Sequence, residues 1–410
     1  MSLNEISSTE FETKDSSYYN NLMGLLVSGI LHGHDLSSTE CQKAYAEIHD
    51  LDRKTEIDIN KEYTRYADLV RNYSYEEFCA LLKPKVIVSF TTYPPRINSI
   101  TETLKTIYNQ SFQLDEVILC LAESDFPGKK SELPDSVMKL VEDGRLTILW
   151  GENLKPHKKY FYPMLARKDD VIITIDDDLF YEKHMVEKLY LSYLAYPTAV
   201  SACRCHLIMF DRDNHFLPYK QWGQNQSIIL NKPFMGLFPT NGAGSLFPPH
   251  ILDTSFFDIE LIKSLCLSAD DLWLKTIEVL TDVPIVAVEK PRRLEYVPGT
   301  QETALWKENV VEKNGNDVAL QRIKKWVDEK YGQDCLEERI LNSSKNTVYS
   351  VYDMYQQRQN LDRNYRKIIA KTKAEIVHEY ESSFAYRVGM IVTYVPRKIM
   401  SIIRKPETHE

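Results

Sequence analysis

The chain has 410 residues, of which 43% are hydrophobic and 27% charged, which is an ordinary composition for a globular protein. This length allows one large domain with appendages, or two domains. The net charge of −9 argues against nucleic acid as a partner, and seven scattered cysteines favour a reducing, cytoplasmic compartment.

Residues 1–84 are predicted to form a helical N-terminal segment. Apolar residues recur at helical spacing over 22–31, 39–48 and 56–82. The first of these runs is shorter than the roughly 20 residues needed to span a bilayer. We therefore expect neither a signal peptide nor an integral membrane protein, and we assign no chemistry to this segment.

Residues 85–315 show alternating strand and helix patterns. The predicted strands are 86–90, 116–121, 146–150, 171–175, 199–203 and 285–288, and the predicted helices are 98–108, 158–166, 181–195 and 270–280. Such alternation predicts an α/β domain whose mainly parallel sheet is flanked by helices.

The most informative feature is the acidic triplet Asp176, Asp177 and Asp178, which follows the strand 171–175. Open α/β sheets bind ligands at the carboxyl ends of their strands. Three adjacent carboxylates repel one another unless a cation neutralises them, and hard oxygen ligands suit Mn²⁺ or Mg²⁺. The triplet therefore predicts a metal site that holds a diphosphate, and the alternative is a solvated acidic turn or helix cap.

A polar turn follows the first predicted strand. Thr91, Thr92 and Tyr93 can hold a nucleobase and ribose there, and Arg96 can hold a phosphate with its planar guanidinium group. The alternative is an ordinary strand-to-helix turn. We count all four residues as candidates for donor binding.

Two further segments offer candidates for donor binding. Lys158 and Lys159 begin the helix before the acidic strand and could neutralise phosphate, although a solvated basic helix start is the alternative. Gly242 and Gly244 lie in a loop that would let the backbone approach a ligand closely. We interpret His250, which follows this loop, as a loop residue rather than a metal ligand.

Asp270 and Asp271 begin the predicted helix 270–280. Either carboxylate could act as a general base on an acceptor hydroxyl, and Asp270 is both the favoured base and the favoured capping residue. The alternative is helix capping, because acidic residues at a helix start are stabilising. The sequence does not separate these roles.

The C-terminal part of the chain is predicted to contain two further segments. Residues 316–380 form a helical extension, and its part 346–380 could pair with a copy of itself as a homodimer. Within 381–410, the stretch 384–405 has five cations and no acidic residue among its apolar residues. This composition predicts an amphipathic tail that docks on an anionic membrane surface.

The chain resembles glycosyltransferases of the GT-A fold, above all bacterial family-2-like enzymes that build surface polysaccharide. The segments that carry this resemblance are, in chain order, VSFTTYPPRI, KPHKKYFY, VIITIDDD, NGAGSLFPP and SADDLWL. The resemblance covers about residues 85–300. It implies a metal-binding DxD motif in which Asp178 holds the ion and Asp176 contacts the ribose or the metal. It also implies a catalytic base in SADD. The family motif is often Glu-Asp, whereas Ala269 replaces the Glu here, so both aspartates remain candidates.

The resemblance implies an inverting, metal-dependent transferase that uses a nucleotide sugar, with UDP as the expected nucleotide. A retaining reaction, which would not need that base, stays open as the alternative. The acceptor would be a saccharide or a lipid-linked saccharide in capsule, exopolysaccharide or lipopolysaccharide assembly. The enzyme would lie on the cytoplasmic face of the plasma membrane. The alternatives are a sugar nucleotidyltransferase, whose glycine-rich first loop is missing here, and a silent membrane scaffold, which would need neither acidic motif.

Overall fold

The structure is a computed structural model, and it describes residues 16–32, 38–50, 63–301, 315–343, 363–364, 366–375 and 378. The chain divides into two compact units, Met1–Val348 and Tyr349–Glu410, and the elements below belong to the first. No helix in these described ranges is long and apolar enough to cross a membrane. The predicted docking tail, 384–405, lies outside the described residues, and the predicted four-part division of the chain stays a prediction.

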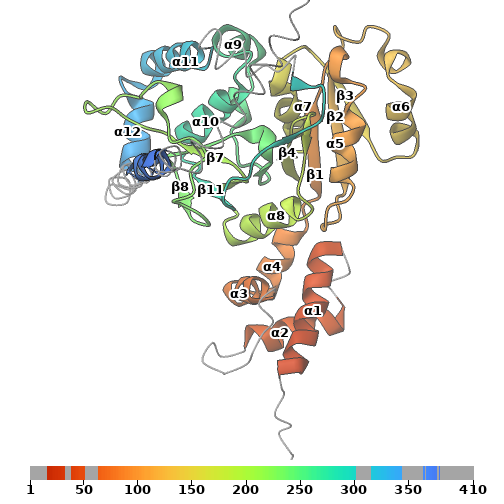
Figure 1. Ribbon diagram of the computed structural model, residues 1–410. Coiled ribbons are helices and arrows are strands. Elements are labelled where there is room, and N and C mark those ends of the chain that lie inside the picture. The colour runs from red at the N-terminus through yellow and green to blue at the C-terminus, as the bar shows by residue number, and fades with distance from the viewer. Residues whose placement is uncertain are drawn as a thin grey trace, which may run out of the picture. The chain divides into compact units, whose positions relative to one another are not determined.

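Eight strands form the central sheet in the order β3-β2-β1-β4-β10-β6-β11-β8 (Figure 1). They are β1 (Val86–Thr91), β2 (Glu116–Ala122), β3 (Thr147–Gly151), β4 (Val171–Thr174), β6 (Val200–Ala202), β8 (Pro233–Phe234), β10 (Ser245–Phe247) and β11 (Ile285–Ala287). Strands β10 and β8 run against their neighbours, and the other pairs are parallel. This confirms the predicted α/β class with a mainly parallel sheet.

Short strands that the sequence did not predict make two small sheets. They pair β5 (Leu179–Phe180) with β12 (Glu295–Tyr296), and β7 (Cys205–Leu207) with β9 (Leu237–Pro239). Strand β5 ends at Phe180, directly before the predicted helix 181–195, and residues 181–184 connect it to helix α8, which begins only at Met185 and ends at Ala195.

Helices cover the sheet and bury its strands. They include α5 (Ile100–Ile107), α6 (Asp135–Glu142), α7 (Lys158–Ala166), α8 and α10 (Asp270–Leu280). Helices α11 (Gly315–Tyr331) and α12 (Cys335–Asn342) pack against α10, and α9 (Ile259–Leu265) packs against α11. The residues of β4 and the first five of β1 are all buried, as expected for strands covered on both faces. Helix α6 was not predicted.

Four N-terminal helices pack together: α1 (Ser16–His32), α2 (Thr39–His49), α3 (Thr64–Asn72) and α4 (Tyr75–Leu82). The prediction of one helix over 56–82 is wrong in its described part, because the chain breaks at Tyr73. Ser74 then starts a new helix through a capping box, in which its hydroxyl accepts from the Glu77 amide and Glu77 accepts from the Ser74 amide.

The strand order reverses beside β1. The chain moves outward from β1 through β2 to β3 and then returns to place β4 on the other side of β1. In open α/β sheets, ligands bind at such a switch point, outside the carboxyl ends of the strands. The loops that follow β1 and β4 therefore define where a ligand site is expected, and the acidic triplet lies in the second of them.

Candidate functional site

The acidic triplet is mostly buried. The side chains of Asp177 and Asp178 are 7% and 8% exposed, whereas that of Asp176 is 44% exposed. The carboxylate of Asp177 accepts hydrogen bonds from Thr92 Oγ1 (2.5 Å) and Arg96 Nη1 (2.8 Å). Asp177 therefore ties the loop after β4 to the loop after β1. A solvated acidic turn, the alternative weighed from the sequence, is wrong.

Arg96 neutralises two carboxylates of the triplet. Its Nη1 atom also lies 3.1 Å from Asp178 Oδ2, and its Nη2 atom donates to the Thr300 carbonyl at 3.0 Å. Gln301 donates to the same Asp178 oxygen at 2.8 Å. Burial, reinforced by the charge of Asp176, nevertheless raises the pKa of Asp178 to about 7. The positive charge of Arg96 therefore does not fully offset the burial of Asp178 and the negative charge of Asp176.

Lys159 joins the triplet to helix α10. Its Nζ atom lies 2.9 Å from Asp176 Oδ1 and 3.0 Å from Asp270 Oδ2, and its side chain is only 4% exposed. Burial alone would lower the pKa of Lys159, but the facing carboxylates outweigh it and hold the pKa well above its usual value. His157 and Lys158 are also buried, so a solvated basic helix start is wrong.

Three predicted donor-binding residues have other contacts in the structure. Lys158 donates to Asn153 Oδ1 at 3.3 Å, away from the Lys159 contacts. Thr91 donates to the Cys120 carbonyl within the sheet at 2.7 Å. The ring of Tyr93 lies 5.7 Å from the guanidinium carbon of Arg96.

The glycine loop shapes the surroundings of Asp176. A Cβ atom at Gly242 would lie 1.8 Å from Asp176 Oδ2, so any larger residue there would displace the Asp176 carboxylate from its present position. The Gly242 carbonyl accepts from the Asp176 amide (3.0 Å) and from the Tyr181 hydroxyl (2.5 Å). Gly244 has a φ of +104° and faces Met185 rather than the triplet.

The two aspartates of α10 have different surroundings. The helix begins at Asp270, and the preceding residue, Ala269, makes no side-chain cap. Asp270 is buried against Lys159. Burial would raise the pKa of Asp270, but the charge of Lys159, together with the charge of His157 and the hydrogen bonds to Asp270, outweighs burial and lowers it. Asp271 is half-buried, and its Oδ1 accepts from both the backbone amide and the side-chain amide of Asn241 at 3.0 Å. Burial and the charge of Asp270 raise the pKa of Asp271 to about 7.

Sequence reasoning missed three residues that hold this site together. Gln301 and Asn241 fix Asp178 and Asp271, and Tyr181 fixes the glycine loop. Gln301 lies 123 residues from its partner, so no local pattern indicates it. His250, predicted to be a loop residue, is exposed and contacts the exposed Asp169.

The donor set fits a hard divalent cation. Asp176 and Asp178 offer carboxylate oxygens, and the missing side chain of Gly242 leaves the space that the Asp176 carboxylate occupies. Such oxygens are the ligands that Mg²⁺ and Mn²⁺ prefer. A further positive charge would also relieve the repulsion that raises the pKa of Asp178.

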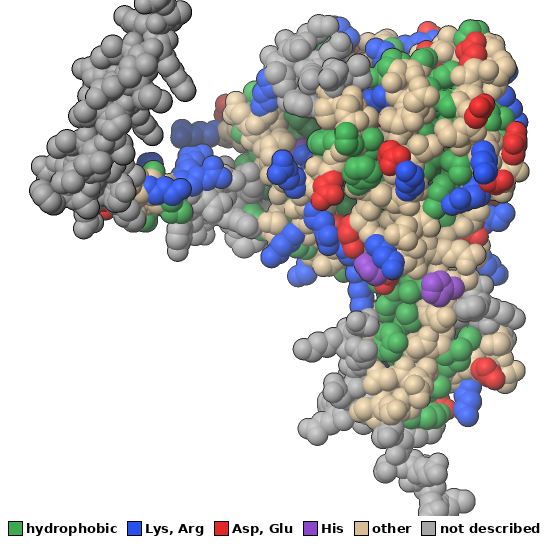
Figure 2. Space-filling view, turned by 45° about the vertical axis from the view of Figure 1, so that its right-hand side comes forward, with side chains coloured by type: hydrophobic (Ala, Val, Ile, Leu, Met, Phe, Trp, Pro, Cys, Tyr) green, Lys and Arg blue, Asp and Glu red, His purple; other side chains and the backbone are tan. Residues whose placement is uncertain are grey.

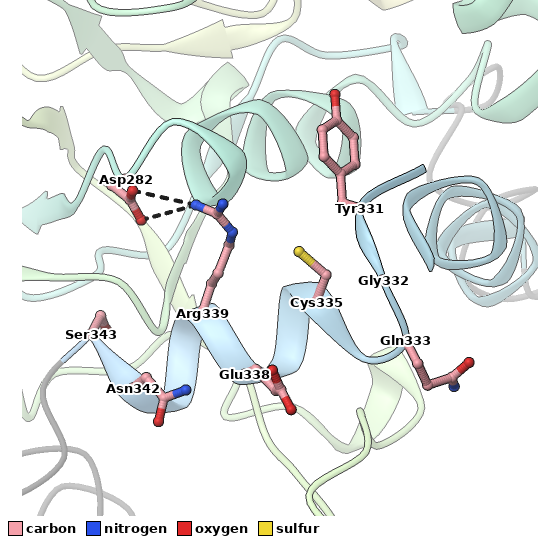
Figure 3. Close-up of a pocket in the computed structure, with 9 residues that line it drawn as sticks. All are labelled: Asp282, Tyr331, Gly332, Gln333, Cys335, Glu338, Arg339, Asn342 and Ser343. Carbon is pink, nitrogen blue, oxygen red and sulfur yellow. Dashed lines mark hydrogen bonds and ion pairs between the residues drawn. The ribbon is translucent and has the colours of Figure 1, made fainter. Parts of the chain in front are cut away.

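A separate hollow of about 450 Å³ lies at helix α12 (Figure 3). Arg339 faces Asp282 across it, with Nη1 3.3 Å from each carboxylate oxygen. None of the residues that line it belongs to the acidic triplet or to the start of α10. On the face shown in Figure 2, basic and acidic side chains are interspersed, so no patch of a single charge sign marks a binding site on that face. The candidate site is therefore recognised by its buried charged groups.

Comparisons with known proteins give only weak likenesses. No protein-family model matches the chain, and no curated protein matches it. Among solved structures, it is similar to the mannosyltransferase PcManGT from Pyrobaculum calidifontis in complex with GDP-Man and Mn²⁺, with 12% identity, a TM-score of 0.38, and coverage of 91% of this chain and 95% of that one.

Two other solved structures cover about half of this chain. A 4-diphosphocytidyl-2C-methyl-D-erythritol synthase is 10% identical, with a TM-score of 0.31 and coverage of 54% of this chain and 96% of that one. A CMP:2-keto-3-deoxy-manno-octonic acid synthetase complexed with CTP is 10% identical, with a TM-score of 0.32 and coverage of 54% and 97%. Likenesses of this strength carry no conclusion about the activity of this chain.

Proposed function

We propose that this chain is a metal-dependent glycosyltransferase that moves a sugar from a nucleoside-diphosphate sugar, with UDP as the expected nucleotide, to an acceptor hydroxyl. The observation that carries the proposal is the convergence of three segments at one edge of the sheet. Lys159 contacts both Asp176 and Asp270, and Asp271 is adjacent on the same helix. A cation-binding pair of carboxylates thus shares one lysine with a candidate general base, which suits transfer from a diphosphate.

Asp176 and Asp178 would hold Mn²⁺ or Mg²⁺, which supplies charge stabilisation of the diphosphate leaving group when bound. Arg96 and Lys159 hold the carboxylates in place through ion pairs. Thr92 and Asp177 brace the loops on either side of this site. The two loops thereby form one rigid support for the donor.

We assign Asp271 as the base of an inverting reaction. Its pKa of about 7 suits proton transfer near neutral pH, whereas the ion pair of Asp270 with Lys159 makes Asp270 a weak base. The acceptor oxygen bonds to the anomeric carbon as the bond from that carbon to the phosphate oxygen breaks. Asp271 takes the hydroxyl proton, and the nucleoside diphosphate leaves with the bonding electron pair.

The biological setting follows from the resemblance. The same proposal includes assembly of a bacterial surface polysaccharide, docking of 384–405 on the anionic inner face of the plasma membrane, and pairing of two copies through 346–380. A saccharide or lipid-linked saccharide is the expected acceptor.

Asp178→Ala tests the donor site directly. Wild-type protein should be stabilised by one nucleotide sugar in the presence of Mn²⁺, by about 2.7 kcal/mol when the ligand is at roughly 100 times its Kd. Asp178→Ala should lose this stabilisation because a metal ligand is removed. The measurement is thermal unfolding with UDP-, GDP-, CMP- and dTDP-linked sugars, with and without Mn²⁺.

The control is Asp169→Ala, which removes an exposed carboxylate before the start of β4, at the opposite end of this strand from the triplet, and should respond like wild type. A metal-dependent shift that persists in Asp178→Ala would refute the metal assignment. Release of pyrophosphate from a nucleoside triphosphate and a sugar phosphate would instead identify a nucleotidyltransferase. No shift with any nucleotide would favour the silent scaffold.

A further inference from the structure

A second hollow lies beside the acidic triplet, at the edge of the sheet where β6 and β11 end. We call it the arginine pocket, and it measures about 240 Å³. Residues from four segments line it, and those used below are Tyr181, Arg204, Ala243, Glu289, Arg292 and Arg293. Tyr181 follows the triplet and Ala243 follows Gly242, so the arginine pocket adjoins the candidate donor site.

Two guanidinium groups in this pocket lack an acidic partner within the described part of the chain. Arg204 donates from Nη1 to Thr240 Oγ1 at 3.2 Å, and no described carboxylate forms an ion pair with Arg204 or Arg293. Arg292 differs, because its Nε atom lies 3.3 Å from Glu289. Arg204 and Arg293 can therefore offer several N–H donors to an anion.

The acidic residues of the wall are largely neutralised by other cations. Lys188 Nζ lies 2.8 Å from Glu182 and 3.0 Å from Glu289. Glu295 also lines the pocket and is exposed. The guanidinium groups of Arg204 and Arg293 thus face a wall in which two of the three glutamates already have a partner.

The arginine pocket is also connected to the candidate base. Thr240, which accepts from Arg204, immediately precedes Asn241, and Asn241 holds Asp271 through two hydrogen bonds. An anion held by Arg204 would consequently lie on the same short, hydrogen-bonded segment that positions the base. This connection favours a group that belongs to the acceptor.

We propose that the arginine pocket binds an anionic group of the acceptor, a phosphate or a carboxylate, through Arg204 and Arg293. This inference rests on the proposed function and names the acceptor class for the same site. Guanidinium groups form paired, charge-assisted hydrogen bonds with both kinds of anion. Such binding would orient the acceptor so that a hydroxyl group reaches Asp271.

Arg204 and Arg293 could form the same hydrogen bonds with the diphosphate of the donor. The experiment therefore distinguishes an anionic group of the acceptor from the donor diphosphate. The probe is glycerol 1-phosphate, with glycerol as the uncharged reference, titrated into the full chain and followed by ³¹P NMR. Each titration is run with and without saturating UDP and Mg²⁺. The variants are Arg204→Ala, Arg293→Ala and the conservative Arg204→Lys, and the matched control is Arg212→Ala, which removes an exposed arginine outside the pocket.

We expect glycerol 1-phosphate to bind equally well with the donor site filled. Arg204→Ala and Arg293→Ala should each raise its Kd at least about tenfold, which corresponds to roughly 1.4 kcal/mol. Arg212→Ala should leave the Kd unchanged, and Arg204→Lys should retain part of the binding while showing that the fold tolerates change at this position.

Three results would overturn the inference. One is competition between the probe and UDP, which would assign the arginines to the donor diphosphate. The others are an unchanged Kd in both alanine variants, and no binding of the probe to wild-type protein. Failure of UDP itself to bind would count against the proposed donor site, while the arginine dependence measured without UDP would still test the pocket.

Discussion

Lys159 is the residue that connects the two halves of the candidate site. Its ammonium group lies within 3.0 Å of carboxylates from the β4 loop and from α10, and no more than 4% of the side chain is exposed. A buried lysine without partners would lose its charge, but two facing carboxylates keep this one protonated. The position of Asp270, and with it the start of α10, therefore depends on this single ammonium group.

The pH dependence of transfer should report Asp271. Its pKa of about 7 means that the base is protonated, and hence inactive, below neutral pH, so kcat/KM should rise as the pH increases through about 7. Asp270→Asn removes the neighbouring negative charge that raises this pKa, and the acidic limb should therefore move to lower pH. The measurement is a pH–rate profile at saturating Mn²⁺.

Asp271→Asn supplies the control for this assignment. It should lower kcat by roughly 100-fold or more, because the residue can no longer accept a proton. Near wild-type turnover in Asp271→Asn, or an acidic limb that stays in place in Asp270→Asn, would show that another group titrates.

Gly242→Ala should reduce transfer without unfolding the protein. The added methyl group would meet the Asp176 carboxylate at 1.8 Å and push this half-exposed side chain out of place. A displacement of about 1 Å in a catalytic site can cost roughly 100-fold in rate. Gly24→Ala is the control, since its methyl group would make an ordinary contact 3.6 Å from the Tyr63 hydroxyl. Equal activity and thermal stability in both variants would contradict this role of Gly242.

The sequence identified the acidic triplet because a buried β-branched strand ends directly in three carboxylates. It did not distinguish Lys158 from Lys159, although successive side chains of a helix point about 100° apart and only Lys159 faces the triplet. Gln301 was out of reach for a different reason. Its contact with Asp178 depends on how β12 returns the chain to β5, and no local pattern encodes that return.

At the scale of elements, helix α10 carries both the candidate base and a buried ion pair. Lys275 Nζ lies 3.6 Å from a Glu278 carboxylate oxygen, and Glu278 is fully buried. Neither carboxylate oxygen of Glu278 has a hydrogen-bond donor within the described residues. Burial raises the pKa of Glu278 to about 7 and lowers that of Lys275. This pair contributes little to stability, because desolvation offsets the attraction.

Removing one partner should therefore be worse than removing both. Lys275→Met leaves the carboxylate of Glu278 buried and unpaired, and should lower the free energy of unfolding by about 3–5 kcal/mol at pH 8. Adding Glu278→Leu should restore stability to about the wild-type value or above it. Urea unfolding of the two variants decides the matter, and a double variant less stable than the single one would refute the explanation.

Prediction succeeded for long elements and failed for short ones. The strands β1, β2 and β4 are fully buried over nearly their whole length, so continuous apolar runs marked them. The strands β5 and β12 have two residues each. They are strands because they pair with each other, and not because their residues favour the strand conformation. The break before α4 was missed because Ser74 and Glu77 form their capping box inside a continuous apolar pattern.

At the scale of the whole first unit, the N-terminal helices are joined to the sheet through α8. The Tyr66 hydroxyl on α3 donates to Glu187 on α8 at 2.7 Å, and the Tyr73 hydroxyl donates to the Leu194 carbonyl at 2.6 Å. Figure 1 shows α3 and α4 on the side of α8. Ser111 donates to the other oxygen of Glu187 at 2.7 Å. Glu187 is therefore a shared acceptor between the N-terminal helices and the α/β body.

Tyr66→Phe should weaken this junction. It removes a hydrogen bond to a charged and largely buried acceptor, so the free energy of unfolding should fall by roughly 1.5–3 kcal/mol. Tyr108→Phe, which removes an exposed hydrogen bond to the Arg145 carbonyl, should have a smaller effect. Urea unfolding measures both, and equal losses would show that α3 is not stabilised through Glu187.

The antiparallel strand β10 lies between β4 and β6. It separates the strands that come earlier in the chain from β6 and β11, which come later. Everything on the β4 side of it comes from residues before α8, and β6 and β11 come from residues after α8. Under the proposed function, a hybrid joined within α8 would combine one donor half with a foreign acceptor half. It would need to keep the contacts that cross this boundary, which include the pairing of β4 with β10, the hydrogen bonds of Asp176 and Tyr181 with Gly242, and the contacts of Lys159 with Asp270 and of Asp178 with Gln301. If these contacts are kept, the choice of acceptor should change in the hybrid while the proposed metal-binding half stays as it is.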